Sequence, residues 1–150
     1  MGVDELAKPV GVPCAHVRPG QGCGIYAERP HACRTFECVW LMDAEMPPGF
    51  RPDRTKVVLD QDPEGLCLIA RCDPANPQAW RRNPMYAALK GRAEDTWGTG
   101  KIVLATAGRR TWLITPRDDL DLGELDLRGG LKVTERADGS VAVEVAGQGP

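Results

Sequence analysis

The chain has 150 residues, of which 42% are hydrophobic and 27% are charged, and its formal net charge is −2. This length predicts a single domain that can bury a core, and the composition excludes a disordered chain. The small net charge gives no reason to expect a nucleic acid or an anionic membrane as a partner. Neither an apolar leader near the start nor a run of membrane-spanning length is seen, so we expect a cytoplasmic protein with reduced thiols.

The chain divides by composition within one predicted domain, residues 1–150. Residues 1–45 are rich in cysteine, glycine and proline and show little hydrophobic periodicity, so we expect an irregular, metal-binding lobe. The stretch "MPPGFRPDR" at 46–54 is rich in turn-forming residues. Residues 50–148 are expected to form an α+β portion built from hairpins and one main helix.

The first elements of that portion follow from alternation and turn signals. Residues 55–60 and 65–72 predict two antiparallel strands joined by a longer loop. Residues 76–95 predict a short turn and then a helix, because an Asn-Pro pair, which suits a helix start, occurs twice. The residues expected on the buried face of this helix are Trp80, Met85, Ala88 and Leu89.

The last third of the chain predicts further hairpins. Residues 101–107 and 110–116 predict a strand pair. Residues 131–145 alternate around Asp138-Gly139, a pair that favours a two-residue hairpin turn. The stretch from 117 to 144 holds eight acidic and four basic residues, which we interpret as a solvated face. The fold class is therefore α+β.

The six cysteines fall into two groups. Cys67 and Cys72 occupy one predicted strand at an odd separation, so they should lie on opposite faces as small buried hydrophobic residues. Thiol-rich clusters on glycine-containing loops in a reduced compartment suit Zn²⁺ or an iron–sulfur cluster. The other four cysteines form such a cluster: Cys14, Cys23, Cys33 and Cys38. The alternative is that these four are buried free thiols.

The spacing of these four cysteines limits the kind of metal site that they can form. It matches neither paired C-x₂-C knuckles nor a C-x-x-C redox motif. On a continuous helix Cys33 and Cys38 would point roughly 140° apart, so both can bind one ion only if the chain turns near residues 35–37. Pro30 predicts a helical turn that begins just before Cys33. His16, two residues after Cys14, is interpreted as a neighbour of the site, with replacement of one cysteine as a ligand as the alternative.

Charge is consistent with thiolates in this segment. Four thiolates on one Zn²⁺ leave a formal charge of −2, which calls for donors or cations nearby. Residues 8–56 carry seven basic and five acidic side chains. Arg18, Arg29 and Arg34 lie within the cluster, and we interpret them as compensating the thiolates, with an anionic partner as the alternative.

Residues 22–41, "GCGIYAERPHACRTFECVWL", resemble the downstream half of the YkgJ-like cysteine-cluster family. That family's pattern has a cysteine, here Cys14, then Gly-Cys-x-Ile-Tyr and Arg-Pro-x-x-Cys-Arg-x-Phe-x-Cys. Residues 72–90 are also similar to a bacterial subset of the family. The resemblance implies zinc or iron chelation, or an iron–sulfur cluster.

The chain also departs from this family. Members usually carry an N-terminal C-x₃-C-x₂-C-C or similar cluster that has no counterpart here, and Val17 stands where a cysteine is frequent. We expect either that the natural start is missing or that this member holds a single metal. Four thiols are the number that one closed tetrahedral site requires.

The leading hypothesis is a metal-binding protein in which Cys14, Cys23, Cys33 and Cys38 hold one structural Zn²⁺. A closed site leaves no open position for catalysis, so an accessory or interaction role with a protein partner is favoured over an enzyme. The alternative is an iron or iron–sulfur protein with redox or protein-modifying activity. A nucleic-acid-binding zinc module is disfavoured, because the local basic excess is small.

Overall fold

The centre of the molecule is a five-stranded mixed sheet with strand order β3-β4-β5-β6-β7. The structure, a computed structural model, describes residues 2–9, 12–18, 21–62, 64–127 and 130–145. The sheet strands are β3 (Val57–Gln61), β4 (Cys67–Cys72), β5 (Ile102–Ala107), β6 (Arg110–Ile114) and β7 (Asp119–Glu124). Helices and strands combine in one α+β fold, as predicted.

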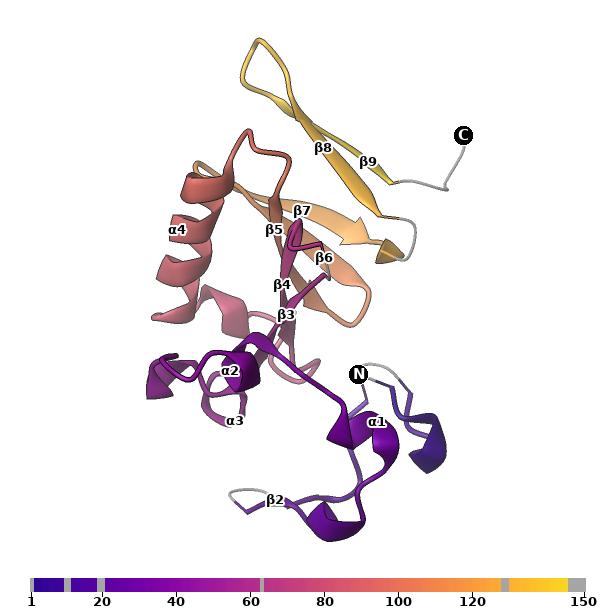
Figure 1. The fold of residues 1–150 in the computed structure, drawn as a ribbon. Coiled ribbons are helices and arrows are strands. Elements are labelled where there is room, and N and C mark those ends of the chain that lie inside the picture. Colours follow the sequence, from indigo (N-terminus) through magenta and orange to yellow (C-terminus); the bar gives the residue numbers. More distant parts are fainter. Residues whose placement is uncertain (1, 10–11, 19–20, 63, 128–129, 146–150) are drawn as a thin grey trace.

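Strand directions within this sheet are mixed. β3 pairs with β4, β5 with β6 and β6 with β7 in antiparallel fashion, whereas β4 and β5 are parallel. Parallel neighbours need a crossover connection. That connection contains the 3₁₀ turn η4 (Ala79–Arg81) and helix α4 (Met85–Thr96), which lies along one side of the sheet (Figure 1). The two hairpins were predicted, while the parallel pairing and strand β7 were not.

Helix α4 and η4 form the core with one face of the sheet. Trp80, Met85 and Leu89 are almost fully buried, and the Trp80 ring centroid lies 5.7 Å from that of Trp112 on β6. The prediction that Ala88 is buried was wrong, because Ala88 is exposed. The buried stripe continues instead at the helical spacing through Ala93 and Thr96.

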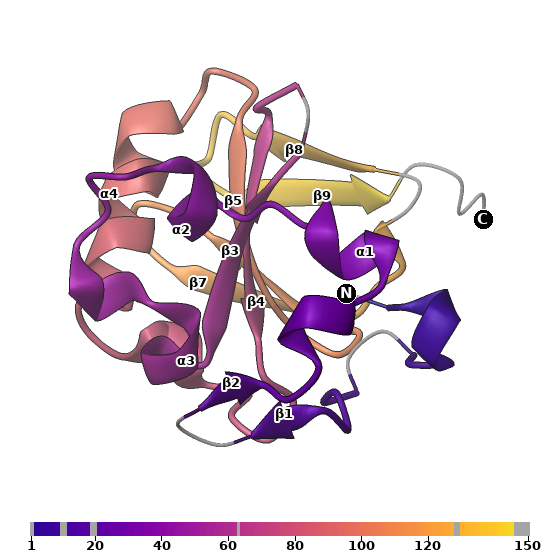
Figure 2. The same ribbon diagram turned by 60° about the horizontal axis from the view of Figure 1, so that its bottom comes forward.

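A separate two-stranded hairpin, formed by β8 (Leu131–Glu135) and β9 (Val141–Val145), covers the opposite face of the sheet. The two strands pair antiparallel, as the sequence predicted. Their apolar side chains pack against three buried sheet residues, Ile69, Leu104 and Leu113. The order of layers is therefore helix, sheet and hairpin (Figures 1 and 2).

The turn of this hairpin differs from the predicted two-residue form. The Arg136 amide donates to the Ser140 carbonyl at 2.8 Å, and the Gly139 amide donates to the Arg136 carbonyl at 2.9 Å. These bonds enclose three loop residues, with Gly139 at φ +81° in the last position. This is a type I turn followed by a bulge, in which glycine supplies the left-handed conformation.

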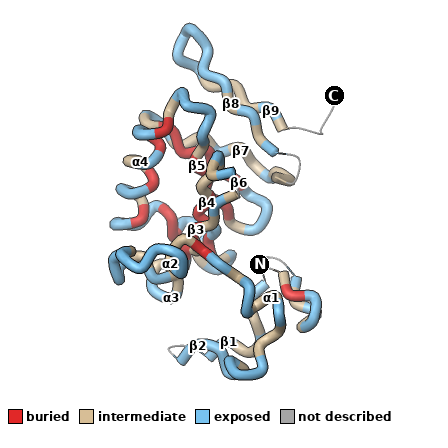
Figure 3. Tube along the Cα trace, in the orientation of Figure 1, coloured by how far each residue is buried: buried red, intermediate tan, exposed pale blue. Residues whose placement is uncertain are grey.

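The N-terminal segment forms a lobe of short elements. They are η1 (Asp4–Leu6), β1 (Val17–Arg18), β2 (Gly22–Cys23), η2 (Tyr26–Glu28) and α1 (His31–Arg34). After them, α2 (Val39–Met42), η3 (Pro48–Phe50) and α3 (Pro52–Thr55) lead into the sheet, and α2 and α3 lie against β3. Figure 3 shows the lobe as almost entirely exposed or intermediate. In the described part of the chain, no helix is long and apolar enough to span a bilayer.

Candidate metal centre

The four cysteines of the predicted site lie in different surroundings. All six thiols of the chain are free. Cys14 precedes β1 and Cys33 lies in α1, and both are partly buried; Cys23 ends β2 and is exposed. Cys38 is only 3% exposed and stands directly before α2.

The chain does turn between the last two cysteines. Helix α1 ends at Arg34, and Cys38 has the extended conformation (φ −129°, ψ 164°) that precedes α2. The continuous helix that would direct the two thiols apart is therefore absent. Pro30 stands immediately before α1, so the predicted helical turn around Cys33 is confirmed.

Backbone hydrogen bonds hold the segments of Cys14, His16 and Cys23 together. The Val17 amide donates to the Cys14 carbonyl at 3.1 Å, and Val17 pairs with Cys23 across the β1–β2 ladder. The Gly24 amide donates to the His16 carbonyl at 2.7 Å. A Cβ on Gly24 would lie 3.2 Å from that carbonyl oxygen and 2.8 Å from Nε of Arg18, so a larger residue would require both to shift.

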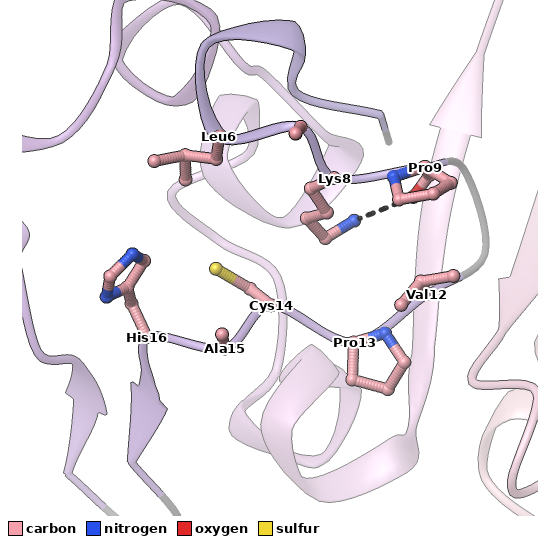
Figure 4. A pocket seen from close by; sticks show the side chains of 9 residues that line it. Leu6, Lys8, Pro9, Val12, Pro13, Cys14, Ala15 and His16 are labelled. Atoms are coloured by element: carbon pink, nitrogen blue, oxygen red, sulfur yellow. Dashed lines mark hydrogen bonds between the residues drawn. The ribbon is translucent and has the colours of Figure 1, made fainter.

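Cys14 and His16 line the same cavity. Its volume is about 180 Å³, and it lies between η1 and the segment that precedes β1. The thiol of Cys14 and the imidazole of His16 point to the same side, facing Leu6 (Figure 4). Helix α1 is tied to η1, because the Ala32 amide donates to Oε1 of Glu5 at 3.4 Å.

The arginines predicted to compensate thiolates are in different states. Arg34 donates from Nε to the Arg29 carbonyl at 2.8 Å and from Nη2 to the Ala27 carbonyl at 3.0 Å, so it fastens α1 to η2. The Arg29 guanidinium lies 3.9 Å from the centre of the Tyr26 ring. Its Nε is buried and has no hydrogen-bond partner among the described residues. A buried charged donor in this state favours an acceptor close by.

The donor set fits a zinc-type ion in its chemistry, since thiolates and imidazole are the usual ligands of Zn²⁺. The orphaned Nε of Arg29 is a suitable donor toward a thiolate. The positions of these side chains, however, do not fit a metal ion. No three His, Cys, Asp or Glu side chains of the described residues lie close enough together to hold a metal ion. The described side chains of the lobe are therefore not arranged as a metal site.

Cys67 and Cys72 lie at the two ends of β4 on opposite faces of the sheet, as predicted, but only Cys72 is buried and Cys67 is partly buried. Burial is the main reason why the pKa of Cys67 is raised to about 12, with Asp62 adding to the effect. Burial likewise raises the pKa of Cys72 to about 11. Both groups therefore remain thiols at neutral pH and are poor metal ligands.

One polar cluster was not predicted from the sequence. The carboxylate of Asp119, 6% exposed, accepts from Nη1 of Arg81 at 3.2 Å, from the hydroxyl of Tyr86 at 3.0 Å and from Nζ of Lys90 at 3.4 Å. Lys90 also donates to the Thr115 carbonyl at 2.6 Å. The cluster fastens α4 to the β6–β7 turn. Arg81, Tyr86 and Lys90 are close in sequence, but Asp119 lies at least 29 residues from each of them, so no local motif predicts the cluster.

Comparisons of the chain with family models, with curated proteins and with solved structures found no match. The resemblance of residues 22–41 to the YkgJ-like cysteine-cluster family therefore stays a prediction.

Proposed function

We propose that the protein binds one structural Zn²⁺ through the cysteines of its N-terminal lobe. The candidates from the sequence are Cys14, Cys23, Cys33 and Cys38. The observation that carries the proposal is that the lobe has almost no interior. Among the described residues of 2–45, only Val3 and Cys38 are buried.

Apolar side chains of this lobe are instead exposed. Five of them stand out: Val12, Val17, Tyr26, Leu41 and Met42. A segment that buries so little apolar surface needs another source of stability, because ordering each residue costs about 1–2 kcal/mol in backbone entropy. Structural zinc supplies about 10–16 kcal/mol in zinc-finger peptides, and that binding energy is folding energy.

The proposed role is accessory and not catalytic. Four protein donors close the tetrahedral shell of zinc and leave no position for a substrate. We propose a protein partner for the lobe, because several of its large apolar side chains remain exposed. A cytoplasmic setting agrees with this proposal, because reduced thiols persist there.

The test is elemental analysis with an absorption spectrum on protein purified without oxygen. We expect one zinc per chain and no visible absorption band. Cys33→Ala should abolish stoichiometric zinc, whereas the matched control Cys67→Ala, at a thiol of β4, should retain it. Iron with charge-transfer bands would replace this proposal with an iron or iron–sulfur function at the same thiols. Wild-type protein without any metal would overturn both.

A further inference from the structure

We infer that His16 is a ligand of the metal and that it takes the place of Cys38. The inference rests on the proposed zinc function and changes its donor set to Cys14, His16, Cys23 and Cys33. Three cysteines and one histidine form an ordinary structural zinc site.

The first argument is the position of His16. Its imidazole and the thiol of Cys14 line one cavity of about 180 Å³ and point to the same side (Figure 4). His16 is partly buried, whereas His31, the other histidine of the chain, is exposed on α1. The carbonyl of His16 also accepts from Gly24, the neighbour of Cys23. An ion in this cavity would thus meet two donors at once, with a third on the adjoining strand.

The second argument is the position of Cys38. Residues 35–37 separate it from α1, and it stands before α2, where its carbonyl accepts from Leu41 at 2.8 Å and from Met42 at 3.1 Å. The next residue, Val39, packs against the core that lies between the sheet and helix α4. Both views of the fold show α2 against β3 and α1 out in the lobe (Figures 1 and 2). Cys38 is thus a small buried residue at the start of α2, next to a residue that packs against the core.

Charge points in the same direction. Three thiolates and a neutral imidazole leave a zinc site at −1, whereas four thiolates leave it at −2. Arg34 already donates two hydrogen bonds to backbone carbonyls. Arg29, with its buried and unpartnered Nε, still has a donor to offer. The mixed site therefore needs less compensation from cations in this lobe.

The test is a Co²⁺ titration of metal-free protein without oxygen, followed by absorption. Thiolate-to-cobalt bands in the near ultraviolet report the number of thiolates, and the visible bands distinguish four sulfurs from three sulfurs and a nitrogen. We expect the mixed spectrum. His16→Ala should weaken Co²⁺ binding by more than about 100-fold, because losing only a partner of a ligand costs 10–100-fold. His31→Ala and Cys38→Ala should leave the spectrum unchanged.

A second measurement does not depend on a variant. In protein labelled with ¹⁵N-histidine, Zn²⁺ should shift the imidazole nitrogens of one of the two histidines, assigned to His16 with the His31→Ala variant. A four-sulfur cobalt spectrum, an unshifted His16 imidazole and loss of thiolate bands in Cys38→Ala would overturn this inference and leave zinc binding intact. Absence of any Co²⁺ or Zn²⁺ binding by the wild type would overturn both.

Discussion

Cys67 and Cys72 lie five residues apart on β4 with their thiols on opposite faces of the sheet. Cys67 packs on the side covered by the β8–β9 hairpin, and Cys72 on the side covered by α4. Burial raises the pKa of both thiols, to about 12 and about 11. These two cysteines are therefore chemically separate from those of the lobe, although all six are free.

Alkylation should distinguish the two groups. In native, metal-free protein at pH 8, iodoacetamide should modify Cys23 fastest, because it is exposed, followed by Cys14 and Cys33. Cys67 and Cys72 should stay unmodified, since only the thiolate reacts. Peptide mass spectrometry over time provides the measurement, and unfolded protein, in which all six should react, is the control. Rapid labelling of Cys67 in the native state would contradict the burial described here.

The raised thiol pKa values also predict an alkaline loss of stability. Unfolded cysteines ionise near the ordinary pKa of 9.0, while folded Cys67 keeps its proton until about 12. Above pH 9 the unfolded state therefore binds fewer protons, so the free energy of unfolding falls as the pH rises toward 12. Below pH 9 this contribution is fully present. Urea unfolding between pH 8 and pH 10.5 should show a shallower decline in Cys67→Ala than in the wild type, and equal slopes would count against it.

Asp119 should be the most costly charge to remove from the α+β portion. In Asp119→Asn the ammonium of Lys90 and the guanidinium of Arg81 lose their ionised partner, so we expect a loss of about 2–3 kcal/mol in unfolding free energy. Urea unfolding at pH 7 measures it. The matched control is Asp121→Asn on the same strand, whose exposed pair with Arg110 should contribute little. Equal effects of the two substitutions would mean that the buried cluster has no special weight.

Substitutions of Gly139 should lower the stability of the protein by amounts that depend on the new residue. Its φ of +81° disfavours side chains, so Gly139→Ala should destabilise the protein by about 1 kcal/mol. A Cβ at this position would lie 3.4 Å from Nη1 of Arg117, an ordinary contact, so the cost comes from the backbone. Gly139→Asn should cost less, because asparagine adopts the left-handed region more readily. A thermal unfolding series of the three proteins is sufficient, and a neutral alanine variant would exclude the described turn.

Local patterns predicted the elements whose residues decide their own conformation. The runs that became β3, β4, β5 and β6 are rich in β-branched and apolar residues, and α4 begins after an Asn-Pro pair. The parallel pairing of β4 and β5 was out of reach, because it depends on contacts across a crossover. Strand β7 was missed although Leu120 and Leu122 alternate with acids, since the acidity of the stretch suggested only a solvated face.

The sequence predicted a candidate metal centre in the N-terminal lobe but did not rank its donors, and that centre stays a prediction. Cysteine spacing placed the four thiols in one predicted lobe, and helix geometry required a turn between Cys33 and Cys38 only if both bind one ion. Which side of that turn Cys38 joins depends on how α2 docks on the sheet, which is a tertiary contact. The shared cavity of Cys14 and His16 likewise depends on η1, whose residues carry no metal-binding signal.

The acidic stretch has a further consequence, because part of it forms β7, one of the two outer strands of the sheet. An outer strand offers unpaired backbone groups to which a strand of another molecule can add. Asp121 and Glu124 place exposed carboxylates on it. Asp121 pairs with Arg110 at 2.6 Å and Glu124 lies 3.9 Å from Arg109, so this edge carries charges of both signs. A strand of another molecule would have to desolvate these charged side chains, so they disfavour its addition to β7.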